Sequence, residues 1–183
     1  MSRYSKLKDQ AILCAQNSNC KFKHGAIIIK GNRVVCRGYN NDRSSFLGKL
    51  DYQQHAEMNV VTKFFNQNIR RNPDILKNIH RYKILVVRIS NNEDHKTVSS
   101  GPCITCVNRL KDLGFRYLIY SNENDELQEI NLKTYSHQHF TSTYSKRYAI
   151  AGNDINLFKK MDLIHHSKCI CCKRKCKCSR CNN

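Results

Sequence analysis

The chain has 183 residues, of which 40% are hydrophobic and 25% charged, which fits a soluble globular domain with its own core. No apolar run reaches the length of a transmembrane helix and the first residues lack a signal-peptide core, so we expect a cytoplasmic protein whose 11 cysteines stay reduced. The net charge of +18 favours nucleotides, nucleic acid or anionic membranes as partners, although an AT-rich coding sequence would produce part of the same excess.

The first part of the chain predicts a helix, a hairpin and a second helix. Residues 4–17 carry apolar side chains at helical spacing. Two β-branched runs, 24–30 and 33–39, join through Gly31-Asn32, a pair that tolerates the positive φ of a tight turn. Residues 55–69 predict the second helix from apolar positions that recur on one side.

The next part predicts a parallel βαβ unit followed by one more strand. Residues 82–89 are mostly apolar, as in a buried central strand, and 103–113 look helical. The segment 116–122 predicts a strand parallel to the first. Only a short polar turn precedes 127–135, so we expect a fifth, antiparallel strand. The expected fold is an α/β sandwich, one mixed sheet of about five strands with helices on its faces.

The chain is expected to divide into two parts. Residues 1–150 form the predicted domain. Residues 151–183 form a basic, cysteine-rich tail of low complexity that should be flexible or metal-binding, with a short helix at 155–164. From residue 146 onward, ten lysines and arginines stand against two acidic residues.

Two cysteines three residues apart, Cys103 and Cys106, open one predicted helix, and His55 opens another. Helix N-termini lower thiol pKa values and favour metal-binding sulfur, although a CxxC pair beside a βαβ unit also suits redox chemistry. A catalytic zinc takes three protein ligands and keeps one position for water, and His55 is the best third ligand. Glu57, two residues further on, could face that water and carry its proton.

These residues carry a resemblance to a family. His55-Ala56-Glu57 followed by Pro102-Cys103-x-x-Cys106 is similar to the signature of zinc-dependent nucleobase deaminases. The hairpin ending in Gly-Tyr-Asn and the segment from Cys103 to Asn122 resemble cytidine and deoxycytidylate deaminases. Over residues 4–135 the resemblance implies their three-layer α-β-α fold, and homo-oligomers are expected from it.

The resemblance also implies an activity. His55, Cys103 and Cys106 would bind Zn²⁺ and Glu57 would shuttle protons while an activated water attacks C4 of a cytosine ring, giving uracil and ammonia. The implied partner is a small pyrimidine nucleoside or nucleotide, as in pyrimidine salvage. Asn40 matches a position that contacts sugar or base.

Further substrate contacts are also expected. The backbone around Ala56 and Cys103 would line the base pocket. Arg43 and Ser44, just after Asn40, could receive a phosphate, although solvated loop residues are the plainer interpretation.

Two departures favour a small substrate. Many relatives that act on nucleic acid carry Glu where this chain has Gly101. An antiparallel fifth strand resembles the free-nucleoside branch of the family, whereas the branch with a helix at this place includes nucleic-acid editors and also many deoxycytidylate deaminases. This feature therefore argues against the nucleotide that the basic charge favours. The alternatives are an RNA- or single-stranded-DNA-editing deaminase guided by the basic surface and tail, and a non-catalytic zinc module.

The tail has three interpretations: a second metal site, a basic arm that contacts nucleic acid or membrane phosphate, and an inert extension. Six tail cysteines at C-x-C spacings make up the second candidate metal site: Cys169, Cys171, Cys172, Cys176, Cys178 and Cys181.

Overall fold

The computed structural model describes residues 4–42, 45–46, 49–50, 54–68, 72–92 and 96–135. Its elements in chain order are α1 (Ser5–Gln16), β1 (His24–Lys30), β2 (Arg33–Tyr39), β3 (Ser45–Phe46), β4 (Lys49–Leu50), α2 (Ala56–Asn68), the 3-10 helices η1 (Pro73–Ile75) and η2 (Ile79–Arg81), β5 (Tyr82–Ile89), β6 (Thr97–Val98), α3 (Ile104–Asp112), β7 (Tyr117–Ser121) and β8 (Leu127–Asn131). The helices predicted at 4–17, 55–69 and 103–113 and the five longer strands are confirmed.

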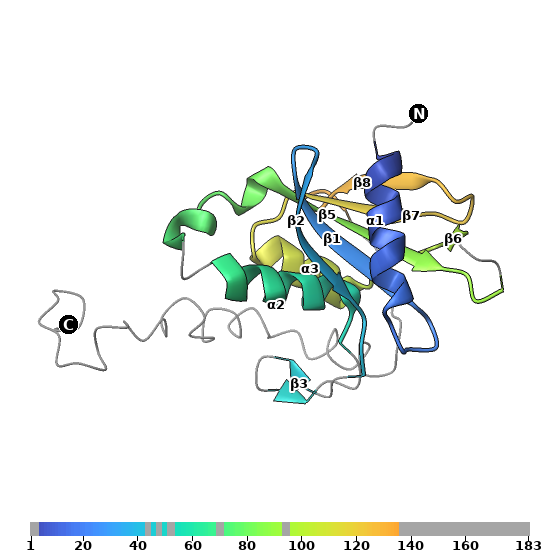
Figure 1. The fold of residues 1–183 in the computed structure, drawn as a ribbon. Coiled ribbons are helices and arrows are strands. Elements are labelled where there is room, and N and C mark those ends of the chain that lie inside the picture. Colours follow the sequence, from blue (N-terminus) through green and yellow to red (C-terminus); the bar gives the residue numbers. More distant parts are fainter. Residues whose placement is uncertain are drawn as a thin grey trace, which may run out of the picture. The chain divides into compact units, whose positions relative to one another are not determined.

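A mixed sheet of six strands forms the centre of the fold (Figure 1). The strands follow the order β2-β1-β5-β7-β8, and β6 pairs with β5. Strands β5 and β7 are parallel, which requires a crossover that α3 supplies, whereas β8 runs antiparallel to β7 as predicted. Strand β6 and the separate β3–β4 pair were not predicted, because two residues carry no measurable alternation.

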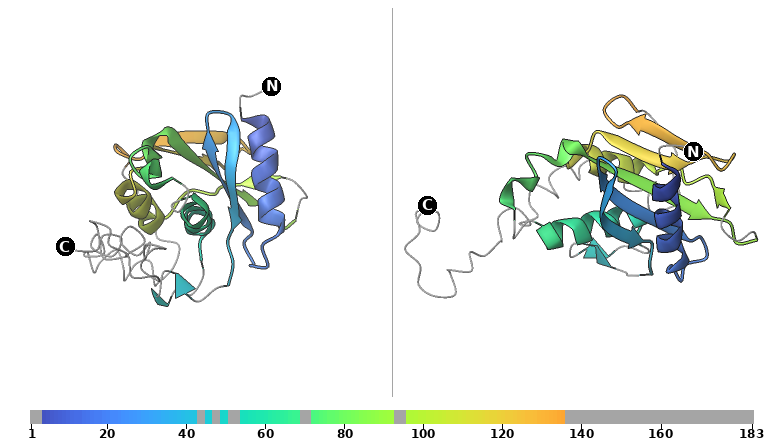
Figure 2. Two further views of the ribbon diagram at one scale, coloured as in Figure 1. Left: turned by 60° about the vertical axis from the view of Figure 1, so that its left-hand side comes forward. Right: turned by 45° about the horizontal axis from the view of Figure 1, so that its top comes forward.

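Helices cover both faces of the sheet, giving the expected three layers. The left view of Figure 2 shows α1 on one side and α2 and α3 on the other. The buried face of α1 packs on one set of strand residues, Ile27, Ile29, Leu85, Val87 and Ile119. Because side chains alternate along a strand, the equally buried Ala26, Ile28, Ile84, Val86 and Leu118 face the α2 and α3 side.

Two glycines let helices lie directly against the sheet. A Cβ added at Gly25 would lie 2.0 Å from the Ala11 carbonyl oxygen of α1. A Cβ added at Gly38 would lie 2.8 Å from the Val60 amide nitrogen of α2. Both sheet faces therefore meet a helix through main-chain contact, at the end of β1 and β2 that lies away from their connecting turn.

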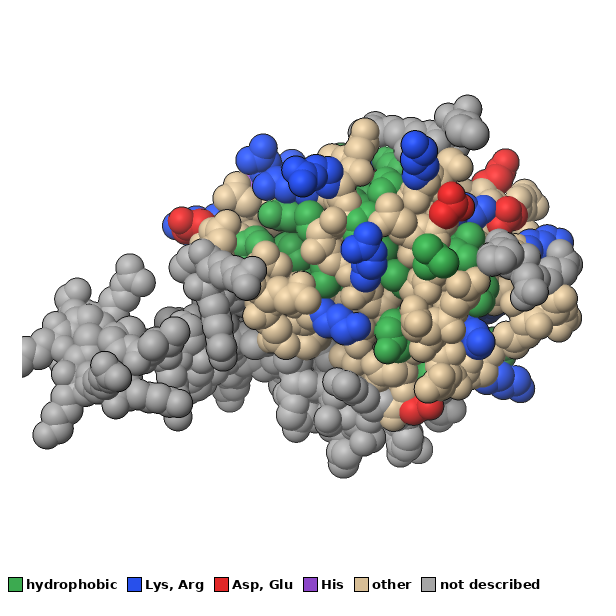
Figure 3. Space-filling model, viewed as in Figure 1, with side chains coloured by type: hydrophobic (Ala, Val, Ile, Leu, Met, Phe, Trp, Pro, Cys, Tyr) green, Lys and Arg blue, Asp and Glu red, His purple; other side chains and the backbone are tan. Residues whose placement is uncertain are grey.

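Several predictions concern residues that the structure does not describe. The domain boundary at residues 150 and 151 and the helix at 155–164 lie outside the described residues and stay predictions. No helix in the described ranges combines the length and apolarity that crossing a bilayer requires. On the face seen in Figure 3, lysine and arginine side chains are spread over several elements.

Candidate metal centre

His55 comes just before α2, where the chain is fixed by its neighbours. The Asn59 amide donates to the His55 carbonyl at 2.9 Å, which begins the helix. The Asn59 side chain also donates to Gln54 Oε1 at 3.0 Å, and Gln54 forms an antiparallel bridge with Asn41. Because these contacts hold the segment from both sides, the position of the His55 main chain is set before any ligand binds.

The two cysteines stand at the start of α3. Cys103 is the N-cap residue, and its sulfur accepts a hydrogen bond from the Cys106 amide at 3.5 Å. Both side chains are buried, each only 2% exposed. Pro102, whose fixed φ suits the approach to a helix, is buried beside them.

His55 and the two cysteines, which lie 48 and 51 residues further along the chain, meet in one cluster. The Nδ1 atom of His55 lies 3.5 Å from the Cys103 sulfur and 3.3 Å from the Cys106 sulfur. In a tetrahedral zinc site, bonds of about 2.0 Å to nitrogen and 2.3 Å to sulfur separate these atoms by roughly 3.5 Å. One nitrogen and two sulfurs at this spacing fit zinc with a fourth position open, and these residues could hold that ion.

The thiols titrate as a pair. The hydrogen bond from the Cys106 thiol, together with the charge of His55, holds the pKa of Cys103 well below its usual range. The same hydrogen bond and burial raise the pKa of Cys106. Cys103 is therefore the sulfur that is readily deprotonated for a metal, and α3 begins beside it.

Glu57 is a carboxyl group buried beside this cluster, 6% exposed. Burial raises its pKa, and a negative Cys103 sulfur raises it further, whereas His55 and the Cys106 hydrogen bond oppose the shift. A carboxyl group whose pKa is raised holds a proton more readily than an ordinary carboxylate, which suits proton transfer.

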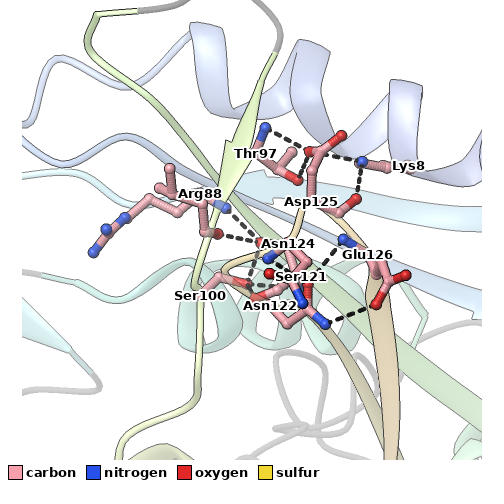
Figure 4. Close-up of polar contacts among 10 residues, drawn as sticks. Lys8, Arg88, Thr97, Ser100, Ser121, Asn122, Asn124, Asp125 and Glu126 are labelled. Carbon is pink, nitrogen blue, oxygen red and sulfur yellow. Dashed lines mark hydrogen bonds and ion pairs between the residues drawn. The ribbon is translucent and has the colours of Figure 1, made fainter.

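A serine pair fixes the loop before Cys103, and the sequence analysis did not single it out (Figure 4). The Ser100 amide donates to the Ser121 carbonyl at 2.8 Å, and the Ser121 amide donates to Ser100 Oγ at 2.9 Å. Ser100 Oγ donates to the Val86 carbonyl at 3.0 Å, and Ser121 Oγ donates to the Val98 carbonyl at 2.6 Å. The loop is thus attached to β5, β6 and β7 three residues before the first sulfur.

Asn40 and Ala56, both expected near a substrate, are buried. The amide nitrogen of Asn40 donates to the Phe22 carbonyl at 2.7 Å, and its Oδ1 accepts from the His24 amide at 2.7 Å. Asn40 therefore anchors the entrance to β1, and a contact with substrate stays a prediction. Arg43, Ser44 and the tail cysteines lie outside the described residues.

His24 lies near the donor set, although no motif in the sequence includes it. Burial lowers the pKa of His24 to about 4; the Phe22 carbonyl opposes this, and Arg88 and His55 lower it further. The charge of Cys103 acts on it as well, so its imidazole is within electrostatic reach of the cluster. Strand register brings His24 opposite Arg88, a pairing that spacing along the chain could not reveal.

Comparison with known proteins adds independent findings. The family model described as "Cytidine and deoxycytidylate deaminase zinc-binding region" matches residues 1–122. A solved structure of cytidine deaminase from Burkholderia pseudomallei is similar at 17% identity and a TM-score of 0.52, covering 72% of this chain and 94% of that one. At this identity the likeness concerns the fold. No curated protein sequence matches significantly.

The dCMP deaminase of cyanophage S-TIM5 also has similar structures. Its complex with dCMP and dUMP gives 23% identity and a TM-score of 0.44 over 64% of this chain and 79% of that one. Its apo form gives 24% identity and a TM-score of 0.41 over 68% and 88%.

Proposed function

Because the chain belongs to the family defined by the cytidine and deoxycytidylate deaminase zinc-binding region, we propose that it hydrolyses the C4–amino bond of cytosine in a free nucleoside or nucleotide. Water supplies the oxygen at C4, and the amino group leaves as ammonia, giving uracil. The observation that carries this proposal is the buried Glu57 carboxyl beside the His55, Cys103 and Cys106 donor set.

The donor set would hold zinc through His55 Nδ1 and the two cysteine sulfurs. When bound, zinc supplies Lewis acidity that lowers the pKa of water to about 7. The protein itself supplies rigidity, because the N-cap contact at Cys103 and the Asn59 contact at His55 hold the donors in place.

Glu57 is the proposed acid and base. Its carboxylate oxygen would take a proton from the attacking water and return it to the departing amino group. The raised pKa supports both directions, since a group that is poised nearer neutral pH accepts and releases protons more evenly. Such proton transfer contributes about 10²- to 10⁴-fold in rate.

The antiparallel β7–β8 pair supports a free substrate. A turn of four residues separates Asn122 from β8, and the pairing extends from Ser121 with Leu127 to Tyr117 with Asn131. This is the arrangement expected of the free-nucleoside branch. It supports a small pyrimidine over a base within a nucleic acid.

The test is a substrate panel on purified, zinc-loaded protein. Cytidine, deoxycytidine, CMP and dCMP are followed by ammonia release and by the absorbance change from cytosine to uracil. Glu57→Gln should retain zinc and lose at least about 100-fold in kcat, whereas Glu123→Gln, an exposed turn carboxylate, should match the wild type.

Two outcomes would favour other functions. Deamination of cytosine only within RNA or single-stranded DNA would favour an editing enzyme. Full zinc loading without turnover of any substrate would favour a non-catalytic module, and an active Glu57→Gln variant would contradict the proposed mechanism.

A further inference from the structure

An arginine and a lysine share one aromatic ring at the end of the sheet near the candidate metal centre. The Arg88 guanidinium carbon lies 5.7 Å from the centre of the Phe22 ring, and Lys21 Nζ lies 5.7 Å from the same point. Phe22 is 54% exposed, although large apolar side chains are usually covered. Two cations therefore converge on an aromatic surface that solvent or a ligand can reach.

Arg88 lies on the sheet face that carries the metal centre. It pairs with His24 across β1 and β5, and the neighbouring pair is Gly25 with Val87. Gly25 and Val87 contact α1, so alternation directs His24 and Arg88 to the opposite face, where α2 and α3 lie. Electrostatic coupling of His24 to Arg88, His55 and Cys103 agrees with this placement.

The main chain around the ring is held in place. The Asn40 side chain donates to the Phe22 carbonyl at 2.7 Å, and the Asn91 side chain donates to the Lys21 carbonyl at 3.0 Å. The Ile89 amide donates to the Lys23 carbonyl at 3.1 Å. These bonds fix the segment before a ligand arrives, which reduces the ordering cost of binding.

No acidic side chain among the described residues forms an ion pair with Arg88 or Lys21. The ion pairs among them join Lys8 to Asp125, Lys77 to Asp74 and Lys83 to Glu129, and none includes Arg88 or Lys21. The close-up in Figure 4 shows the Arg88 side chain extending away from the network around Asp125. A planar guanidinium that has no carboxylate partner among the described residues suits bidentate binding of a phosphate.

We infer that Arg88, assisted by Lys21, binds the phosphate group of a phosphorylated pyrimidine, so that the enzyme acts on a free nucleotide in preference to the nucleoside. The inference rests on the proposed function for the base and adds the group that selects the substrate. The Phe22 ring contacts the guanidinium and helps to fix its orientation.

The experiment compares kcat/KM for dCMP and deoxycytidine in zinc-loaded protein. Wild type should prefer dCMP. Arg88→Gln should lower kcat/KM for dCMP about 10- to 100-fold and change the deoxycytidine value less than about twofold. Arg88→Lys, which keeps the charge without the planar fork, should fall between the two.

The matched control is Arg33→Gln. Arg33 is exposed and pairs with Lys30 at the hairpin end of β1, about 20 Å along the strand from His24. It should match wild type on both substrates. Raising the salt concentration should reduce kcat/KM for dCMP and leave that for deoxycytidine unchanged.

The inference is overturned if Arg88→Gln loses equally on both substrates or keeps full activity on dCMP. Faster deamination of cytosine within a single-stranded oligonucleotide than of dCMP would also overturn it. If wild type deaminates nothing, the proposed function fails separately, and calorimetry then decides the inference: dCMP binding that Arg88→Gln abolishes supports it, and absence of such binding rejects it.

Discussion

Replacing Ser100 by alanine should weaken the fold through a single hydroxyl group. Ser100 Oγ accepts from the Ser121 amide at 2.9 Å and donates to the Val86 carbonyl at 3.0 Å. Both serines are buried, with Ser121 0% exposed, so water cannot replace the lost partner at the Ser121 amide. The donor set itself is not altered by this substitution.

The expected loss follows from these two bonds. A buried amide left without an acceptor costs about 1–3 kcal/mol, and the lost bond to the Val86 carbonyl adds about 1 kcal/mol. Ser121 Oγ keeps its bond to the Val98 carbonyl at 2.6 Å, so it adds little. The free energy of unfolding of Ser100→Ala should fall by about 2 to 4 kcal/mol.

Urea unfolding of zinc-loaded protein measures this loss. The control is Ser99→Ala, the half-buried neighbour, which should change the free energy of unfolding by less than about 0.5 kcal/mol. Zinc stoichiometry should stay at the wild-type value in both variants. A loss for Ser100→Ala no larger than that for Ser99→Ala would refute the role of the serine pair.

Three further predictions concern packing, zinc and pH. Gly25→Ala should cost about 3 kcal/mol or more by thermal unfolding, because its Cβ would lie 2.0 Å from the α1 main chain, whereas Gly101→Ala, with its nearest neighbour at 4.0 Å, should be tolerated. Cys106→Ser should lose bound zinc by atomic absorption, while Cys36→Ser, also buried, should keep it; equal zinc contents would contradict the donor assignment. His24 has a pKa of about 4 in the folded chain against 6.5 for its ordinary value, so the unfolded chain binds more protons between these values and stability is lost as pH falls through this window. In zinc-free protein His24→Gln should remove about 1 to 3 kcal/mol of that loss in urea titrations, and an unchanged pH dependence would reject the burial of His24 as its cause.

The sequence allowed most of the architecture to be predicted, because its signals are local. Gly31-Asn32 predicted the hairpin, and the short turn before residue 127 predicted an antiparallel last strand. The metal centre could also be predicted, since His55 and the CxxC pair each lie at a recognisable helix start.

What could not be predicted depends on register between distant strands. His24 lies opposite Arg88 on the neighbouring strands β1 and β5. Ser100 binds Ser121, although α3 and most of β7 separate the two serines in the sequence. Such pairs produce no recognisable sequence pattern, because the two residues lie far apart in the chain and each one alone is an ordinary polar residue. The role of Asn40 as an anchor for the Phe22 carbonyl likewise became visible only through its contacts.

The close contact between Gly38 and α2 affects which substitutions the chain can accept. The Val60 main chain rests on the strand there, so backbone contact, not side-chain volume, sets the height of α2 above the sheet. Substitutions at buried apolar residues further along α2, such as Phe64, should then move its first turn less than a substitution at Gly38 would. The position of His55, just before α2, should therefore depend more on Gly38 than on which apolar residues fill the core next to this helix.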